Sequence, residues 1–309
     1  MSRYIIKRLL QLIPVMIGVS LLVFFLMNKA SGDAAATIAG VDATLEEIEE
    51  VREQLGLNDP FFVQYARYMG NILKGDMGVS YMTGRDVFQT YIQRVPKTFE
   101  LAIASMIVAL LISIPLGVVA ALNRGTPLDA ASVVTALLGL SMPTFWLGLL
   151  LIMAFSLHFK IFPSSGAETW KSIVLPAITV GANSAAIITR TTRSSMLEVI
   201  SQDYIRTARA KGVPRKLVIR KHALKNALVS IVTVAGLQFS TMLGGSVLTE
   251  TVFSWPGVGR LIIDSIKQRD TPMVMGSLIL TTLLVSVVGL LIDIIYAFLD
   301  PQIKARYSK

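Results

Sequence analysis

Residues 190–226 read RTTRSSMLEVISQDYIRTARAKGVPRKLVIRKHALKN, a basic polar stretch that lies between two long apolar runs. Only Glu198 and Asp203 oppose its positive charge. So many cations do not fit the hydrocarbon core of a bilayer, and short loops rich in Lys and Arg stay on the cytoplasmic side. The stretch therefore predicts a membrane protein with a cytoplasmic loop here. Its basic residues are Arg190, Arg193, Arg206, Arg209, Lys211, Arg215, Lys216, Arg220, Lys221 and Lys225.

The same stretch carries the pattern of a short helix followed by a turn. Tyr204, Ile205, Ala208 and Gly212 follow helical spacing, and Ser194–Lys211 contains neither Gly nor Pro. Gly212 is a helix stop signal, and the proline two residues later suits the first turn of a new helix. Charge and spacing alone leave two interpretations open. The segment is either a loop that only fixes topology or a small folded element that another protein grips.

Composition supports the membrane class and excludes several others. The chain has 309 residues, of which 53% are hydrophobic, and its mean hydropathy is +0.63. The net charge of +9 lies largely in loops and tails beside apolar runs, which argues against nucleic-acid binding. The absence of cysteine excludes disulfides and thiolate metal sites, and His158 and His222 are too few for a metal cluster. We expect no metal site and no cofactor in this chain.

Apolar runs predict an all-α integral membrane protein with six transmembrane helices. The first run follows Arg3, Lys7 and Arg8 and is long enough to span, so we expect an uncleaved helix with a cytoplasmic N-terminus. A basic tail with Lys304, Arg306 and Lys309 places the C-terminus inside as well. The predicted spans are Leu9–Met27, Thr98–Leu122, Ala130–Leu157, Ile173–Thr189, Leu228–Leu248 and Met273–Leu299.

Acidic residues dominate between the first two spans, which predicts an outer segment. Thr44 and Glu47 form a capping box for a helix that Gly56 ends, and Asp59 and Pro60 suit the N-cap and first turn of a second helix. We therefore divide the chain into three parts. Residues 1–27 form the N-terminal tail and first span, residues 28–97 an extracytoplasmic helical insertion, and residues 98–309 a five-helix core that contains the loop 190–226.

Four separate motifs resemble the peptide and nickel permeases of ABC importers. They are DYIRTARAKG at Asp203–Gly212, LGLNDP at Leu55–Pro60, GDMGVS at Gly75–Ser80 and ETVFSWPGVGR at Glu250–Arg260. The chain looks most similar to the dipeptide and glutathione permeases of that family. By this resemblance, a cytoplasmic coupling helix lies between the fourth and fifth spans and docks on an ATPase. The residues assigned to coupling are Asp203, Tyr204, Ile205, Arg206, Thr207, Ala208, Arg209, Ala210, Lys211 and Gly212.

The resemblance also implies an assembly in a bacterial or archaeal plasma membrane. A second permease would share the pathway, two subunits would bind ATP and Mg²⁺, and an extracytoplasmic substrate-binding protein would deliver cargo. The chain has no Gly-x-x-x-x-Gly-Lys-Ser/Thr loop, so we do not expect it to hydrolyse ATP or to be an enzyme. Expected cargo is a dipeptide, an oligopeptide or glutathione. Nickel or a metallophore is the alternative on the same architecture.

Two rival classes fit the sequence less well. An ion-coupled secondary carrier would bury ionisable groups near the midplane, yet Asp293 is the clear acid within the spans and lies near one end. An intramembrane protease would need a nucleophile with a base, and the spans offer no partner His or Lys at that depth. Small and polar residues on the fourth and fifth spans suit either a pore or close helix packing. The candidate pore-lining residues are Asn183, Gln238, Thr241, Gly245 and Ser246.

Overall fold

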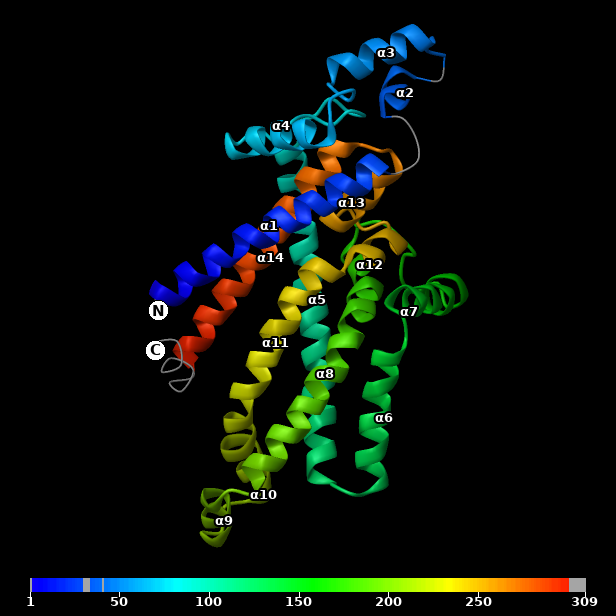
Figure 1. Cartoon of the computed structure of the whole chain (residues 1–309). Coiled ribbons are helices and arrows are strands. Elements are labelled where there is room, and N and C mark those ends of the chain that lie inside the picture. The colour runs from blue at the N-terminus through cyan, green and yellow to red at the C-terminus, as the bar shows by residue number, and fades with distance from the viewer. Residues whose placement is uncertain (1, 30–33, 41, 300–309) are drawn as a thin grey trace. The chain divides into compact units, whose positions relative to one another are not determined.

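A computed structural model describes residues 2–29, 34–40 and 42–299 of the chain (Figure 1). The predicted basic C-terminal tail lies outside these residues. Within them the secondary structure is helical, apart from an isolated β-bridge between Val79 and Asp86, which confirms the all-α prediction. The chain divides into two compact units. We call residues 98–255 with those from Val288 onward the core unit, and residues 2–97 with 256–287 the N-terminal unit.

The helices of each unit are as follows. The N-terminal unit contains α1 (Ser2–Lys29), α2 (Ala34–Ala39), α3 (Leu45–Gln54), α4 (Phe61–Leu73), α13 (Val258–Lys267) and the first parts of α5 (Val87–Leu122) and α14 (Thr271–Leu299). The core unit contains the remaining parts of α5 and α14, with α6 (Pro127–Ser141), α7 (Thr144–Leu151), α8 (Val174–Ile200), α9 (Asp203–Ala210), α10 (Arg215–Leu217), α11 (Lys225–Gly245) and α12 (Val247–Val252). Two π-helical segments, η1 (Ile152–His158) and η3 (Val218–Leu224), and a 3₁₀ turn, η2 (Trp170–Ile173), complete it.

Five helices of the described chain are long and apolar enough to cross a membrane. The third predicted span differs from expectation, because it is two helices bent by 98° rather than one continuous helix. The break falls at Met142, whose backbone is extended (φ −86°, ψ 131°), and at Pro143. A residue before proline is driven out of the helical region, and proline cannot donate the next helical hydrogen bond. The chain thus has six spans only if the bent pair counts as one.

The polar fourth span is the most buried helix of the core unit. In α8, 67% of the apolar window is buried, against 11% in α1 and in α14. Three glycines allow neighbouring backbones to approach it closely. A Cβ at Gly139 of α6 would lie 2.9 Å from the Ala182 carbonyl oxygen, and one at Gly181 would lie 2.7 Å from the Ser105 carbonyl oxygen of α5. At Gly117 of α5 the nearest atom would be a side-chain carbon of α8, 2.5 Å away. Small residues at helix contacts are typical of membrane proteins.

Helices α6, α8 and α11 run side by side in the core unit, and α9 lies at one end of them (Figure 1). The end of α14 is fastened to α11 by Tyr296, whose hydroxyl lies 2.8 Å from the Val232 carbonyl oxygen and 2.6 Å from that of Thr233. Gly236 leaves room for this ring, because a Cβ there would lie 1.7 Å from the tyrosine hydroxyl oxygen. The helices of the second and fourth predicted spans extend beyond their predicted bounds, to 87–122 and 174–200. The helix of the fifth span begins earlier than predicted and ends three residues before Leu248, at 215–245.

The N-terminal unit contains the predicted pair of short helices. The capping box is present, with Glu47 N–H donating to Thr44 Oγ1 (3.3 Å) and Thr44 N–H donating to Glu47 Oε2 (2.7 Å). Gly56 ends α3 with φ +63°, as predicted. The N-cap assignment of Asp59 was wrong, because Pro60 occupies the N-cap of α4 and the Asp59 carboxylate pairs with Arg67 instead. The ion pair with Arg67 on α4 occupies the carboxylate that would otherwise have capped the helix.

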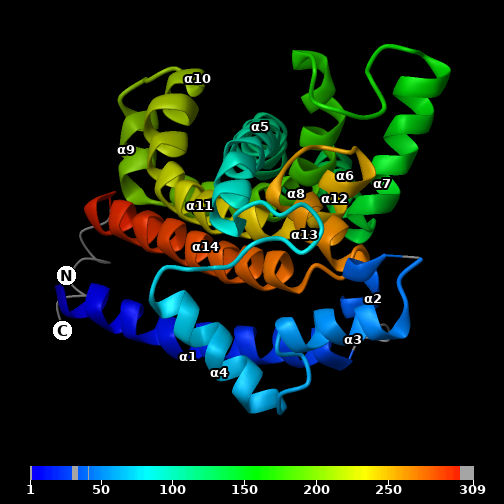
Figure 2. The same cartoon turned by 90° about the horizontal axis from the view of Figure 1, so that it is seen from above.

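Aromatic rings join α4 to α1, as Figure 2 shows by the way α4 lies across α1. Phe24 of α1 lies 5.2 Å from Phe61, 5.6 Å from Tyr65 and 6.4 Å from Tyr68, measured between ring centroids. The Tyr65 hydroxyl also hydrogen-bonds Ser20 of α1 at 2.9 Å. These aromatic side chains therefore pack on a neighbouring helix.

Buried Asp270 fixes the loop that follows α4. Its Oδ1 accepts a hydrogen bond from the Tyr81 amide at 3.1 Å, and its Oδ2 accepts one from the Ser80 hydroxyl. Oδ1 also lies 3.4 Å from the Met273 amide, in the first turn of α14. One carboxylate thus caps α14 and holds the loop 78–81 against it, because hydrogen bonds to a charged acceptor are the stronger kind.

Candidate functional site

The predicted coupling segment folds as a short helix with a glycine stop. Helix α9 spans Asp203–Ala210, and Gly212 follows with φ +75°. The Gly212 amide donates to the Arg209 carbonyl at 2.9 Å and the Val213 amide to the Ala208 carbonyl at 3.2 Å. This pair of bonds is the Schellman motif, which needs a left-handed residue at the position of Gly212. The turn is separated from α8 by Ser201 and Gln202, so the helix does not run on from Ser194 as its composition allowed.

Helix α9 packs against η3, the π-helical segment that leads into α11. Ile205 is fully buried and is the anchor of the helix. Asn226, at the start of α11, donates its amide to the Tyr204 hydroxyl at 3.1 Å and to the His222 carbonyl at 2.7 Å. These contacts tie α9 to the base of α11 without using its outer surface.

The outer surface of α9 is exposed in the described part of the chain and is mainly cationic. Tyr204 is 45% exposed. Arg206 and Asp203 form an exposed pair at 3.6 Å, which contributes little stability in solvent. Ile205 is buried and Ala208 is half-buried. The exposed members of the predicted set are Asp203, Tyr204, Arg206, Thr207, Arg209, Ala210, Lys211 and Gly212.

A partly buried ion pair joins α8 to the first turn of α6. Arg193 of α8 donates from Nε to Asp129 Oδ1 and from Nη2 to Asp129 Oδ2, both at 2.7 Å. Asp129 belongs to the first turn of α6 and is only 6% exposed, and its Oδ2 also accepts the Gly125 amide at 3.0 Å. A bidentate guanidinium–carboxylate pair fixes direction as well as distance. The pair therefore fixes the C-terminal half of α8 to the first turn of α6.

The predicted pore-lining residues do not form one set. Thr241 and Gly245 are exposed on α11, whereas Gln238 is half-buried and accepts a hydrogen bond from Ser184 of α8 at 3.2 Å. Asn183 of α8 is also half-buried. Ser246 is 3% exposed. It follows the last residue of α11 and occupies the N-cap of α12, where its hydroxyl donates to Glu250. Gln238 thus lies in the interface between α8 and α11, whereas Thr241 and Gly245 lie on the exposed face of α11.

Ser246 belongs to a buried carboxylate cluster that sequence reasoning missed. Glu250 of α12 is fully buried, and its Oε1 accepts hydrogen bonds from Ser246 Oγ at 3.0 Å and from Thr98 Oγ1 at 2.9 Å. Asp129 was missed in the same way. Both acids lie beside apolar runs, and an isolated acid in such a position is the sequence signal that could have indicated them. Their partners could not be found from spacing, because Arg193 is 64 residues from Asp129 and Thr98 is 152 residues from Glu250.

Comparisons with known proteins agree over the whole chain. The family described as "Binding-protein-dependent transport system inner membrane component" matches residues 113–305, and its N-terminal companion matches residues 1–102. The chain belongs to this family. The glutathione transport system permease protein GsiC of Escherichia coli strain K12 is 43% identical over 306 residues, which cover 99% of this chain and 100% of that protein. The same protein of Shigella flexneri serotype 5b is 42% identical over the same length.

A solved structure shows the same fold. The chain resembles an inward-facing MetNI methionine ABC transporter with a TM-score of 0.58 and 23% identity, over 69% of this chain and 97% of that one. At this identity the likeness concerns the fold alone. The family resemblance predicted from the motifs is confirmed, and the permease is a multi-pass membrane transport protein rather than an enzyme.

We expect the Arg193–Asp129 pair to stabilise the permease measurably. Arg193→Ala leaves the Asp129 carboxylate without the cation that donates two hydrogen bonds to it, which destabilises the fold. The midpoint of thermal unfolding of the detergent-purified permease should therefore fall by several degrees. Arg190→Ala, which removes an exposed arginine one turn earlier on α8, is the matched control and should leave the midpoint unchanged. Equal unfolding midpoints for Arg193→Ala and Arg190→Ala would contradict a stabilising role of the Arg193–Asp129 pair.

Proposed function

We propose that this permease is a membrane subunit of an ATP-driven importer of short peptides, with dipeptides, oligopeptides and glutathione as the cargo class. The observation that carries the proposal is the 43% identity to GsiC over the full length of both chains. A second permease encloses the pathway, and an extracytoplasmic binding protein delivers the cargo. Two partner subunits bind ATP and Mg²⁺, while this chain itself holds no cofactor.

The proposed topology follows the charge. Both termini and α9 lie in the cytoplasm of a bacterial or archaeal cell, and residues 28–97 lie outside its plasma membrane. The bent pair of α6 with α7 and η1 then counts as one broken span, giving six. The basic residues of 190–226 support the inside assignment, and the acidic residues of 45–54, such as Glu46 and Glu50, support the outside one.

In this proposal α9 is the part of the chain that the ATPase grips. Its exposed residues suit a polar docking surface, while Ile205 and the Asn226–Tyr204 bond transfer its displacement to α11. The Arg193–Asp129 pair makes the lower part of α8 move with the start of α6. A push on α9 thus becomes a rigid-body movement of packed helices, which is a common switching mode. Asn183, Gln238, Thr241 and Gly245 remain pore-lining proposals, and we leave out the buried Ser246.

Import itself is the direct test of the proposal. The permease, assembled in proteoliposomes with its partner subunits and binding protein, should take up labelled glutathione or the dipeptide glycyl-leucine when ATP is supplied. No uptake should occur with a non-hydrolysable ATP analogue. Uptake of a nickel chelate without uptake of either peptide would overturn the assignment of cargo.

The turn after α9 should be essential for coupling because of its backbone conformation. Open space surrounds the position of a Cβ at Gly212, so the constraint is φ +75° and not bulk. Gly212→Val places a β-branched residue in the left-handed region at a cost of about 1–2 kcal/mol, and should uncouple ATP hydrolysis from uptake. Asn tolerates this region, so Gly212→Asn is the control and should retain coupling. We would abandon the docking role of α9 if Gly212→Val transported peptide at the normal rate.

A bulky residue at Thr241 distinguishes a pore from a lipid-facing surface. Thr241→Trp should block uptake while the assembled importer still hydrolyses ATP. Val232 lies nine residues earlier on α11 and is 41% exposed, which puts it on the opposite face of the helix. Val232→Trp is therefore the matched control and should leave uptake intact. Normal uptake with Thr241→Trp would remove this face from the pathway.

A further inference from the structure

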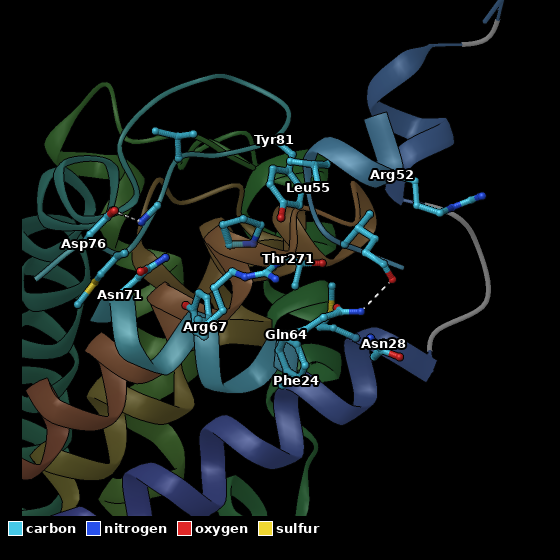
Figure 3. A pocket seen from close by; sticks show the side chains of 17 residues that line it. Phe24, Asn28, Arg52, Leu55, Gln64, Arg67, Asn71, Asp76, Tyr81 and Thr271 are labelled. Atoms are coloured by element: carbon cyan, nitrogen blue, oxygen red, sulfur yellow. Dashed lines mark hydrogen bonds between the residues drawn. The ribbon is translucent and has the colours of Figure 1, made fainter. Parts of the chain in front are cut away.

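The N-terminal unit borders a cavity of about 480 Å³, open on one side, that the coupling and pore proposals do not use. Its walls come from α1, α3, α4, the loop 76–81 and the start of α14, all of which belong to this one unit (Figure 3). Sites for small ligands commonly have volumes of about 300–1,000 Å³ and combine apolar walls with a few placed polar groups. The cavity has this composition, with Phe24 and Leu55 among its apolar lining and Arg67, Asn71 and Asp76 among its polar lining.

Arg67 is the positioned cation of the cavity. It extends from α4 into the cavity toward Thr271 in Figure 3. Its Nη2 donates to the Asp59 carboxylate, and among the described residues it has no second partner. Gly56 gives the guanidinium its place, because a Cβ there would lie 2.1 Å from Nη1. A guanidinium carries five N–H donors, so one carboxylate leaves several for a ligand.

Tyr68, one turn from Gln64 on the same helix, carries a hydroxyl that the protein does not satisfy. Its oxygen is buried and has no hydrogen-bond partner within the described residues. Burial, reinforced by neighbouring Tyr81, raises the pKa of Tyr68 well above its ordinary value, so the group remains an O–H donor. A buried polar group without a partner is unfavourable, and such groups in native structures call for an explanation. The hydroxyl oxygen is itself closed off from solvent, so Tyr68 presents its ring and not its hydroxyl to the cavity.

Asp76 gives the cavity a charge of the opposite sign. Its Oδ1 accepts the Gly78 amide at 2.8 Å, which fixes the carboxylate on the wall beside Asn71 (Figure 3). Arg67 lies away from Asp76 in the same view. A ligand that bears a carboxylate at one end and an ammonium group at the other would match both, since charge-assisted hydrogen bonds are shorter and stronger than neutral ones.

We propose that this cavity is a receiving site for free short peptides, with the peptide carboxylate on Arg67 and its amino group toward Asp76. The inference rests on the proposed function, because it takes the same cargo class and places a first contact with that cargo in the N-terminal unit. The aromatic and aliphatic walls accept varied side chains, whereas the two charged groups select for the ends that all short peptides share.

The test is peptide binding to the complete importer in nanodiscs, without the delivery protein, measured by saturation-transfer NMR. Glycyl-leucine should bind, and glycyl-leucinamide, which lacks only the carboxylate charge, should bind at least about tenfold more weakly. Arg67→Gln should remove this preference for the free carboxylate. Asp59→Asn breaks the same ion pair but keeps the cation, so it should bind glycyl-leucine as the unaltered chain does.

Equal binding of the peptide and its amide, or Arg67→Gln and Asp59→Asn behaving alike, would overturn the receiving site. Import in proteoliposomes separates this failure from that of the proposed function: uptake without cavity binding overturns only the site, and loss of both overturns the function.

Discussion

The burial of α8 is the constraint on which the core unit depends. Its hydroxyls and its asparagine are too polar for lipid, so other helices must surround it, and they do so at backbone distance. Gly181 admits α5, while Gly139 and Gly117 of the neighbouring helices admit α8. Helices in such close contact have few alternative packings, because interiors at crystal-like density do not deform continuously. Any displacement of α8 therefore involves α5 and α6 as well.

The path from α9 into this bundle has one rigid branch and one adaptable branch. The rigid branch runs through α8, where Arg193 and Asp129 form two parallel hydrogen bonds of 2.7 Å. The adaptable branch runs through η3, whose π-helical turns depart from the regular hydrogen-bond ladder just before α11. Such irregular turns are common at functional positions. In the proposed coupling, a push at α9 would change the position of α11 relative to α8, where Gln238 and Ser184 share a single neutral hydrogen bond.

The sequence predicted the features that local chemistry decides. The Gly212 stop, the Thr44–Glu47 capping box and the Gly56 stop depend on residues a few positions apart, and the structure has all of them. Features decided by tertiary contacts were not foreseen. Asp59 pairs with Arg67 instead of capping α4, and Ser246 donates to the buried Glu250 instead of facing a pore. The polarity of α8 fitted both a pore and a packed helix, and only the positions of α5 and α6 show that packing accounts for most of it.

The two units divide the requirements of an importer in a way that their chemistry explains. The likeness to the methionine transporter covers 97% of that chain but 69% of this one, so the shared fold accounts for about two thirds of this chain. Gating needs packed helices and a gripped end, and neither depends on what is carried. Choosing a cargo instead needs fixed donors and acceptors in a space of the right size. In the proposed receiving site, Arg67 and Asp76 supply that donor and that acceptor at the cavity of the N-terminal unit, where Gly56 leaves room for the guanidinium.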